Sequence, residues 1–191
     1  GNTSALYNDF IFDIAETADG SLWVATNGGG LSRFDRGSKT FTTYLHDEAD
    51  STSIGSNSIR RLAVAPDGSL YVATSDAGLY RFDTEAGAFE SIVLLPDSTR
   101  GNKLFELYID ARQRLWVGGD HGLSRIDLKS GLTRTWQHDA DSDSSLAKGS
   151  VRAVLQDAFG SIWVGTYGGG LDRLSADETS FEHFRADSNV E

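Results

Sequence analysis

The sequence predicts an all-β protein made of four copies of one structural unit, and two observations carry this prediction. First, one short segment recurs four times along the 191-residue chain. The copies read SLWVATNGGGLSRFD from residue 21, SLYVATSDAGLYRFD from residue 69, RLWVGGDHGLSRID from residue 114 and SIWVGTYGGGLDRL from residue 161. Second, these segments are rich in the residue types of strands and tight turns, and no stretch of the chain shows a convincing helical pattern.

The spacing of the copies predicts how the units are arranged. The anchoring aromatic residues lie 48, 45 and 47 residues apart, at Trp23, Tyr71, Trp116 and Trp163. A period in this range with four antiparallel strands per repeat is the signature of a β-propeller blade. We therefore expect one β-propeller region over residues 1–191, with four blades of four strands, as a partial ring or a closed four-bladed ring. The expected blades are approximately residues 10–57, 58–102, 103–149 and 150–191.

Each repeat divides into four short strands separated by turn residues. The first repeat is expected to form strands at Ile11–Glu16, Ser21–Thr26, Leu31–Asp35 and Phe41–Leu45. Gly20 and Gly28 follow Asp19 and Asn27 in its turns, and such pairs supply the positive φ of tight hairpins. The second repeat predicts strands at Ile59–Val64, Ser69–Thr74, Leu79–Asp83 and Phe89–Val93, and the last two begin with Leu104–Ile109 and Val151–Gln156. The third repeat has Gln113 in place of the turn glycine.

Composition excludes several classes of function. The formal net charge is −11, the opposite of the balance that nucleic-acid binding requires, and an anionic membrane surface would also repel the chain. The chain has no cysteine, which excludes disulfides, thiolate metal sites and cysteine nucleophiles. Asp139, Asp141 and Asp143 have the alternate spacing of a calcium loop, but the rest of that motif is missing. We expect no cofactor, no metal, no nucleic-acid partner and no direct membrane contact.

The repeat pattern resembles the two-component regulator propeller repeat. The resemblance is strongest at Asp157–Arg173, which reads DAFGSIWVGTYGGGLDR, and all four repeats conform to it. It implies the periplasmic sensor region of a bacterial membrane-anchored signal-transduction receptor, whose output domain is a histidine kinase or a diguanylate cyclase (GGDEF) domain. It also implies a non-catalytic module and, as ligand class, a small molecule or an oligosaccharide.

Residues that differ between copies are the candidate ligand-binding residues, because residues shared by all copies are expected to be structural. The shared arginines Arg33, Arg81, Arg125 and Arg173 and the anchoring aromatics fall in the structural class. The loops after the second strands carry varied residues: Asn27, Asp76, His121 and Tyr167. On the first strands, Arg60 and Arg152 offer guanidinium groups to a carboxylated ligand. The alternatives are free loop variation and charge balance with Asp13 and Glu106.

Two other functions stay open at the level of sequence. One is a propeller enzyme of the streptogramin-lyase type, for which only His121 beside Asp120 loosely fits the required acid and base. The other is a ring that only docks protein partners. Beyond either function, end blades without a neighbour would expose apolar faces, so we expect self-association of the chain into a dimer.

Overall fold

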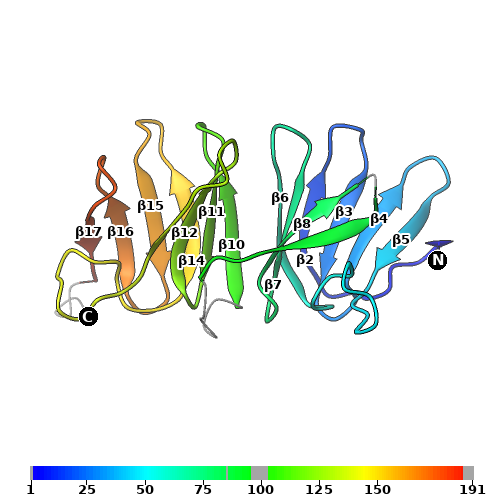
Figure 1. The fold of residues 1–191 in the computed structure, drawn as a ribbon, viewed down its shortest axis with the longest axis horizontal. Helices are drawn as coiled ribbons and strands as arrows, with labels where there is room; N and C mark the ends of the chain where they lie inside the picture. Colours follow the sequence, from blue (N-terminus) through cyan, green and yellow to red (C-terminus); the bar gives the residue numbers. More distant parts are fainter. Residues whose placement is uncertain (1, 85, 96–102, 187–191) are drawn as a thin grey trace. The chain divides into compact units, whose positions relative to one another are not determined.

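All regular structure in the computed structural model is β (Figure 1), and the model describes residues 2–84, 86–95 and 103–186. The strands form four separate antiparallel sheets, here called blades 1 to 4 in chain order. Within each blade the strands run in sequence order from the first to the last, each paired with the next. The predicted fold class is therefore confirmed: the chain is a fragment of a β-propeller with four blades. No helix in the described part of the chain is long and apolar enough to cross a membrane.

The chain divides into two compact units. Unit 1, Gly1–Leu104, holds blades 1 and 2, and unit 2, Phe105–Glu191, holds blades 3 and 4 apart from the first residue of β10. Blade 1 consists of β2 (Ile11–Glu16), β3 (Leu22–Thr26), β4 (Leu31–Asp35) and β5 (Thr40–Tyr44), with β1 (Asn2–Thr3) added beside β5. Blade 2 consists of β6 (Ile59–Val64), β7 (Leu70–Thr74), β8 (Leu79–Asp83) and β9 (Ala88–Ile92).

The second unit repeats this plan. Blade 3 consists of β10 (Leu104–Ile109), β11 (Arg114–Gly119), β12 (Gly122–Asp127) and β13 (Thr133–Trp136). Blade 4 consists of β14 (Val151–Gln156), β15 (Ile162–Thr166), β16 (Gly170–Leu174) and β17 (Phe181–Phe184). The expected blade limits at residues 102 and 191 lie outside the described residues, and the exact boundaries stay a prediction.

The strand limits agree closely with the prediction. All first strands, and the third strands of blades 1 and 2, occupy the predicted residues. The second strands of these two blades begin one residue late, and their fourth strands lie one residue early. Strand β1 was not predicted, because a two-residue pairing leaves no periodic pattern in a sequence.

Two of the anchoring aromatics, Trp23 and Trp116, lie at the contact between the neighbouring blades of their units. In unit 1 the Trp23 ring, 1% exposed, meets Phe82 of blade 2 edge to face at 5.0 Å. In unit 2 Trp116 is fully buried and stacks on Trp136 at 5.7 Å. Its indole Nε1 donates to the buried carboxylate of Asp110 at 2.8 Å, so the polar end of the ring is satisfied. These contacts confirm the structural interpretation of the repeated aromatics.

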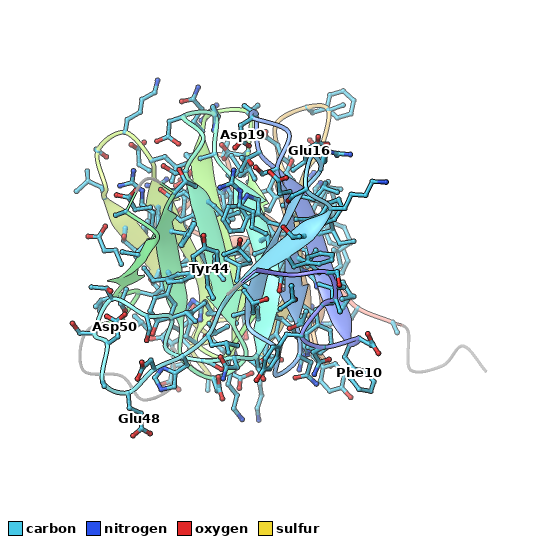
Figure 2. All side chains as sticks on the ribbon, turned by 90° about the vertical axis from the view of Figure 1, so that its right-hand side faces the viewer. Phe10, Glu16, Asp19, Tyr44, Glu48 and Asp50 are labelled. Atoms are coloured by element: carbon cyan, nitrogen blue, oxygen red, sulfur yellow. The ribbon has the colours of Figure 1, made fainter. Side chains whose placement is uncertain are left out.

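The repeated arginines also serve the framework. Arg33 is ion-paired with Asp19 at 3.1 Å, and Arg125 of blade 3 is paired with Glu178 of blade 4. Figure 2 shows Asp19 near one end of blade 1, with Glu48 and Asp50 of the following connector at the other end. The pair of Arg33 and Asp19 therefore lies at the end of blade 1 opposite the following connector.

Candidate functional site

One of the buried positions at which a charge breaks the repeat lies in blade 4. The position lies on the third strand and faces a partner on the fourth strand. The four pairs are Ser32 with Thr43, Tyr80 with Ser91, Ser124 with Thr135, and Asp172 with His183. In blades 1 and 3 the two hydroxyls simply bond each other, at 3.0 and 2.7 Å. Blade 4 places an acid and a histidine where the other blades have neutral groups.

The Asp172 carboxylate is fully buried and accepts three hydrogen bonds. The backbone N–H of Ala147 donates to it at 2.8 Å, His183 Nδ1 at 2.7 Å and Arg185 Nη1 at 3.1 Å. A buried charge is tolerated only with such pairing. Asp172 therefore ties together the connector before blade 4 and the last strand of that blade.

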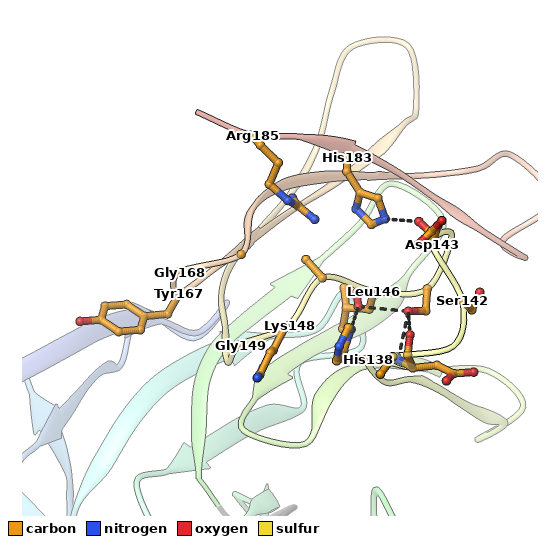
Figure 3. A pocket seen from close by; sticks show the side chains of 15 residues that line it. His138, Ser142, Asp143, Leu146, Lys148, Gly149, Tyr167, Gly168, His183 and Arg185 are labelled. Carbon is orange, nitrogen blue, oxygen red and sulfur yellow. Dashed lines mark hydrogen bonds between the residues drawn. The ribbon is translucent and has the colours of Figure 1, made fainter. Parts of the chain in front are cut away.

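The second nitrogen of the His183 ring contacts the same connector. Its Nε2 lies 2.8 Å from the carbonyl oxygen of Asp143 (Figure 3). Carboxylate and carbonyl oxygens are hydrogen-bond acceptors, so each nitrogen of the His183 ring is engaged with an acceptor. No nitrogen of His183 is left to act as a base.

Above this cluster lies a groove of about 560 Å³. It is bounded by the connector 138–149, by the turn 167–169, and by His183 in β17 and Arg185 just after that strand. Figure 3 shows the exposed Tyr167 at one side of the groove, with Lys148 on the connector and Arg185 across from it. The volume falls within the range typical of small-molecule sites. Donors and acceptors are both present, because Asp139 and Asp143 also line the groove.

The connector itself is a repeated structural element. In unit 2 the Ser145 hydroxyl accepts from the N–H of Asp139 at 3.0 Å and donates to its carbonyl at 2.9 Å. In unit 1 Ser53 makes the same two bonds with Asp47, both at 3.0 Å. A matching groove of about 410 Å³ borders that connector. Its lining has neither the lysine nor the arginine of the unit 2 groove. The charged cluster, not the connector, distinguishes unit 2.

Two of the predicted site residues are brought together in unit 2. Tyr167, 74% exposed, lines the groove, and the guanidinium carbon of Arg152 lies 5.3 Å from the centre of its ring. Arg152 also lies 3.5 Å from the ring centre of Phe105 on the first strand of blade 3. In unit 1 Arg60 packs over Phe12 in the same way, at 4.7 Å. Stacking of this kind, worth about 1 kcal/mol, links the first strands of neighbouring blades.

The loop residues predicted in unit 1 do not join this site. Asn27 forms an isolated bridge with Ser58, whose hydroxyl donates to the Asn27 side chain at 3.2 Å. Asp76 is exposed in the loop between β7 and β8. The candidate residues of unit 1 therefore have other local contacts than Tyr167 and Arg152 in unit 2.

His121 lies in the turn between β11 and β12, with its side chain directed into the protein. Its side chain is 2% exposed, and its Nε2 lies 3.0 Å from the hydroxyl of Ser124. Burial lowers the pKa of His121 from 6.5 to about 4, so the ring is neutral at pH 7. Its shortened loop turns the side chain inward. In this conformation His121 is a core histidine with no access to a ligand.

The sequence analysis missed Asp172, His183, Lys148 and Arg185. The sequence does contain an indication of Asp172, because this acid stands at a position held by serine or tyrosine in the other copies. Because burying a charge is costly, an acid at such a position indicates that partners for it lie nearby. No group of three metal-ligating side chains occurs among the residues that the structure describes.

Comparisons with known proteins agree with the architecture. Two extracellular domains of hybrid two component systems from B. thetaiotaomicron superpose with TM-scores of 0.79 and 0.78, each at 24% identity. The alignments cover 93% and 95% of this chain but 25% and 23% of theirs, so the chain spans about a quarter of their length. Virginiamycin B lyase from Staphylococcus aureus also superposes, with a TM-score of 0.69 and 13% identity over 94% of this chain and 56% of the lyase. At these identities the likeness shows the fold.

Sequence comparison supplies the family. No curated protein matches the chain significantly. The family model described as the two component regulator propeller matches residues 7–28 and 145–168. Both segments run from the end of a connector through the first two strands of a blade, and the second includes one side of the groove. Over these two segments the chain is therefore similar to the two component regulator propeller family.

Proposed function

We propose that the chain is a non-catalytic, ligand-sensing module of an extracytoplasmic receptor, located in the periplasm, and that its ligand binds in the groove of unit 2. The observation that carries the proposal is the buried Asp172 cluster. A framework needs no charge at that position, because blades 1 and 3 fill it with paired hydroxyls. The extracellular origin of the two B. thetaiotaomicron domains supports the location.

The chemistry of the groove favours a neutral, hydroxyl-rich ligand such as an oligosaccharide. Tyr167 offers an exposed ring against which a sugar ring can pack. Lys148 supplies donors and Asp139 supplies acceptors for hydroxyl groups. The net charge of −11 disfavours the approach of a polyanion.

Two of the four histidines are poorly suited to proton transfer, which weighs against a catalytic role for them. A propeller lyase needs a histidine free to transfer a proton near a carboxylate. His183 has both nitrogens engaged, and His121 is buried away from solvent. The superposition on virginiamycin B lyase concerns the shared fold, which does not assign chemistry.

The proposal further includes transmission of binding to an output domain, a histidine kinase or a diguanylate cyclase domain. A ligand that ties the connector to the last strand would favour one arrangement of these elements over another. Such a difference in affinity is what a sensor requires.

A thermal-shift screen tests the proposal. The probes are neutral oligosaccharides of several linkages, with uronic-acid oligosaccharides and inorganic phosphate as anionic comparisons. We expect a neutral oligosaccharide to raise the melting temperature. Lys148→Ala should weaken that effect about tenfold in concentration, corresponding to about 1.4 kcal/mol. Lys129→Ala, on the exposed turn after β12, is the matched control and should bind like the wild type. Equal loss in both variants, or a response to phosphate alone, would refute the proposed site.

A further inference from the structure

Unit 2 has a second pocket, of about 380 Å³, at the end of its strands opposite the groove. The turn 167–169 of blade 4 borders the groove, whereas the turns 157–161 and 175–180 lie at the other end of the same strands. The second pocket is lined there by residues 159–162, 173–176 and Glu178, and by Arg112 and Arg114 of blade 3. Its walls therefore come from two consecutive blades of one unit. The volume falls within the range of small-molecule sites.

Blade 3 breaks the repeat twice at this pocket. In blade 1, Asp19 and Ser21 accept hydrogen bonds from the repeated arginine Arg33, at 3.1 and 3.0 Å. Blade 2 keeps an acid and a serine at the two equivalent positions. Blade 3 has Arg112 and Arg114 there instead. Two cations thus replace the acid and the hydroxyl that the framework uses in unit 1.

The two acids that pair with Arg114 are occupied by other donors as well. Arg114 donates from Nε to Asp110 at 2.6 Å and from Nη1 to Glu178 at 2.5 Å. Asp110 is 4% exposed, and its second oxygen accepts from the backbone N–H groups of Arg112 and Arg114 at 2.9 and 3.1 Å. The second oxygen of Glu178 is paired with Arg125. These contacts bind the two blades together and leave the guanidinium of Arg112 outside the network.

The pocket therefore has one guanidinium to spare. The exposed side chain of Arg112 lines it and has no hydrogen-bond or ion-pair partner within the described part of the chain. Arg173, the third arginine of the lining, is paired with Glu182. A monoanion balances one such charge, whereas the dianionic form of phosphate exceeds it. The planar guanidinium fork matches the two oxygens of a carboxylate.

An aromatic side chain completes the lining. Phe159 is 96% exposed and stands at the position that Asp19 occupies in blade 1. An exposed ring beside a cation offers a surface for the apolar part of a ligand. The hydroxyl of Ser161, also in the lining, can donate or accept a further hydrogen bond.

We propose that this pocket binds a small carboxylic acid with an aromatic or apolar body. The carboxylate accepts hydrogen bonds from two N–H groups of Arg112, and the body packs against Phe159. The inference does not rest on the proposed oligosaccharide groove, which lies at the other end of blade 4 and has a different lining.

An NMR titration of the isotope-labelled chain tests the proposal, with benzoate as the probe. Benzamide, which has the same ring without the charge, is the matched comparison. Benzoate should give saturable shifts at residues 112–114, 159–162 and 174–178, and benzamide should give none. Tighter binding of inorganic phosphate than of benzoate would overturn the choice of a carboxylate. Benzoate shifts centred on residues 138–149 would overturn the choice of this pocket and leave the oligosaccharide proposal to its own test.

Variants of Arg112 separate a specific contact from general attraction. Arg112→Gln should weaken benzoate binding about tenfold, because it removes a charge-assisted pair of hydrogen bonds. Arg112→Lys keeps the charge but loses the fork, so its affinity should lie between those of the wild type and Arg112→Gln. Lys129→Gln is the matched control, since it removes one positive charge from an exposed turn of blade 3 outside the lining.

The control should bind benzoate like the wild type, and circular dichroism checks that each variant keeps the fold. Unchanged affinity in Arg112→Gln would overturn the proposal, as would an equal loss in Lys129→Gln.

Discussion

At the scale of single residues, the buried His121 makes the free energy of unfolding depend on pH. Its pKa of about 4 in the folded protein lies below the 6.5 of an exposed histidine because the buried ring resists charging. Between these pH values the unfolded chain binds more protons than the folded chain, so the free energy of unfolding falls as pH decreases from 6.5 to 4. The full loss is about 3 kcal/mol.

We expect His121→Phe to flatten this part of the stability profile, measured by urea unfolding at a series of pH values. His46→Gln, at an exposed connector histidine, is the control and should keep the wild-type slope between pH 4 and 6.5. An unchanged slope in His121→Phe would show that another group causes the acid sensitivity.

A second residue-scale feature is Gln113, which adopts a φ of +60° where the other repeats use glycine. This left-handed conformation is unfavourable for a residue with a Cβ. Gln113→Gly should therefore stabilise the protein by about 1 kcal/mol in chemical unfolding. Gly68→Gln, at the equivalent turn of blade 2 with a φ of +86°, should destabilise it by a similar amount. Destabilisation by both changes would contradict the strain argument.

At the scale of elements, the charged cluster ties β16, β17 and the connector before blade 4. Asp172→Ser removes the acceptor of three hydrogen bonds and leaves His183 without its acid partner. Because His183 and Arg185 are partly exposed, we expect a loss of about 2 kcal/mol in the free energy of unfolding.

The double variant Asp172→Ser with His183→Thr converts this position to the hydroxyl pair of blades 1 and 3. It should recover most of the lost stability, and a double-mutant cycle measures the coupling. Strictly additive effects of the two substitutions would show that the pair is not coupled.

The sequence predicted the strands well because alternating apolar residues and glycine turns act locally. It distinguishes Asp172 as an acid at a position that is neutral in the other copies, but it does not place Asp172 beside His183 and Ala147, which meet only in the folded blade. Tyr167 was found as a variable loop residue. His121 was selected for the same reason, but its loop turns inward, which loop composition does not determine.

At the scale of the whole molecule, the four blades share one framework, and blade 4 also contributes the candidate site. Neighbouring blades of each unit are held together by repeated residues: Trp23 packs on Phe82, Trp116 lies in one cluster with Val154, and Arg125 is paired with Glu178. The departures from the repeat in blade 4 build the groove. Only the framework could be predicted from the repeat alone, because a site depends on which residues the fold leaves exposed.

The most direct test of the proposed site is an NMR titration of the amide-labelled chain with the oligosaccharide that responds in the thermal screen. Unit 1 provides an internal control, since its connector is built like that of unit 2 but lacks the charged cluster. The account predicts concentration-dependent shifts confined to residues 138–149, 167–169 and 183–185, and their loss in Lys148→Ala. Shifts centred on the connector of unit 1, or spread equally over both units, would contradict it.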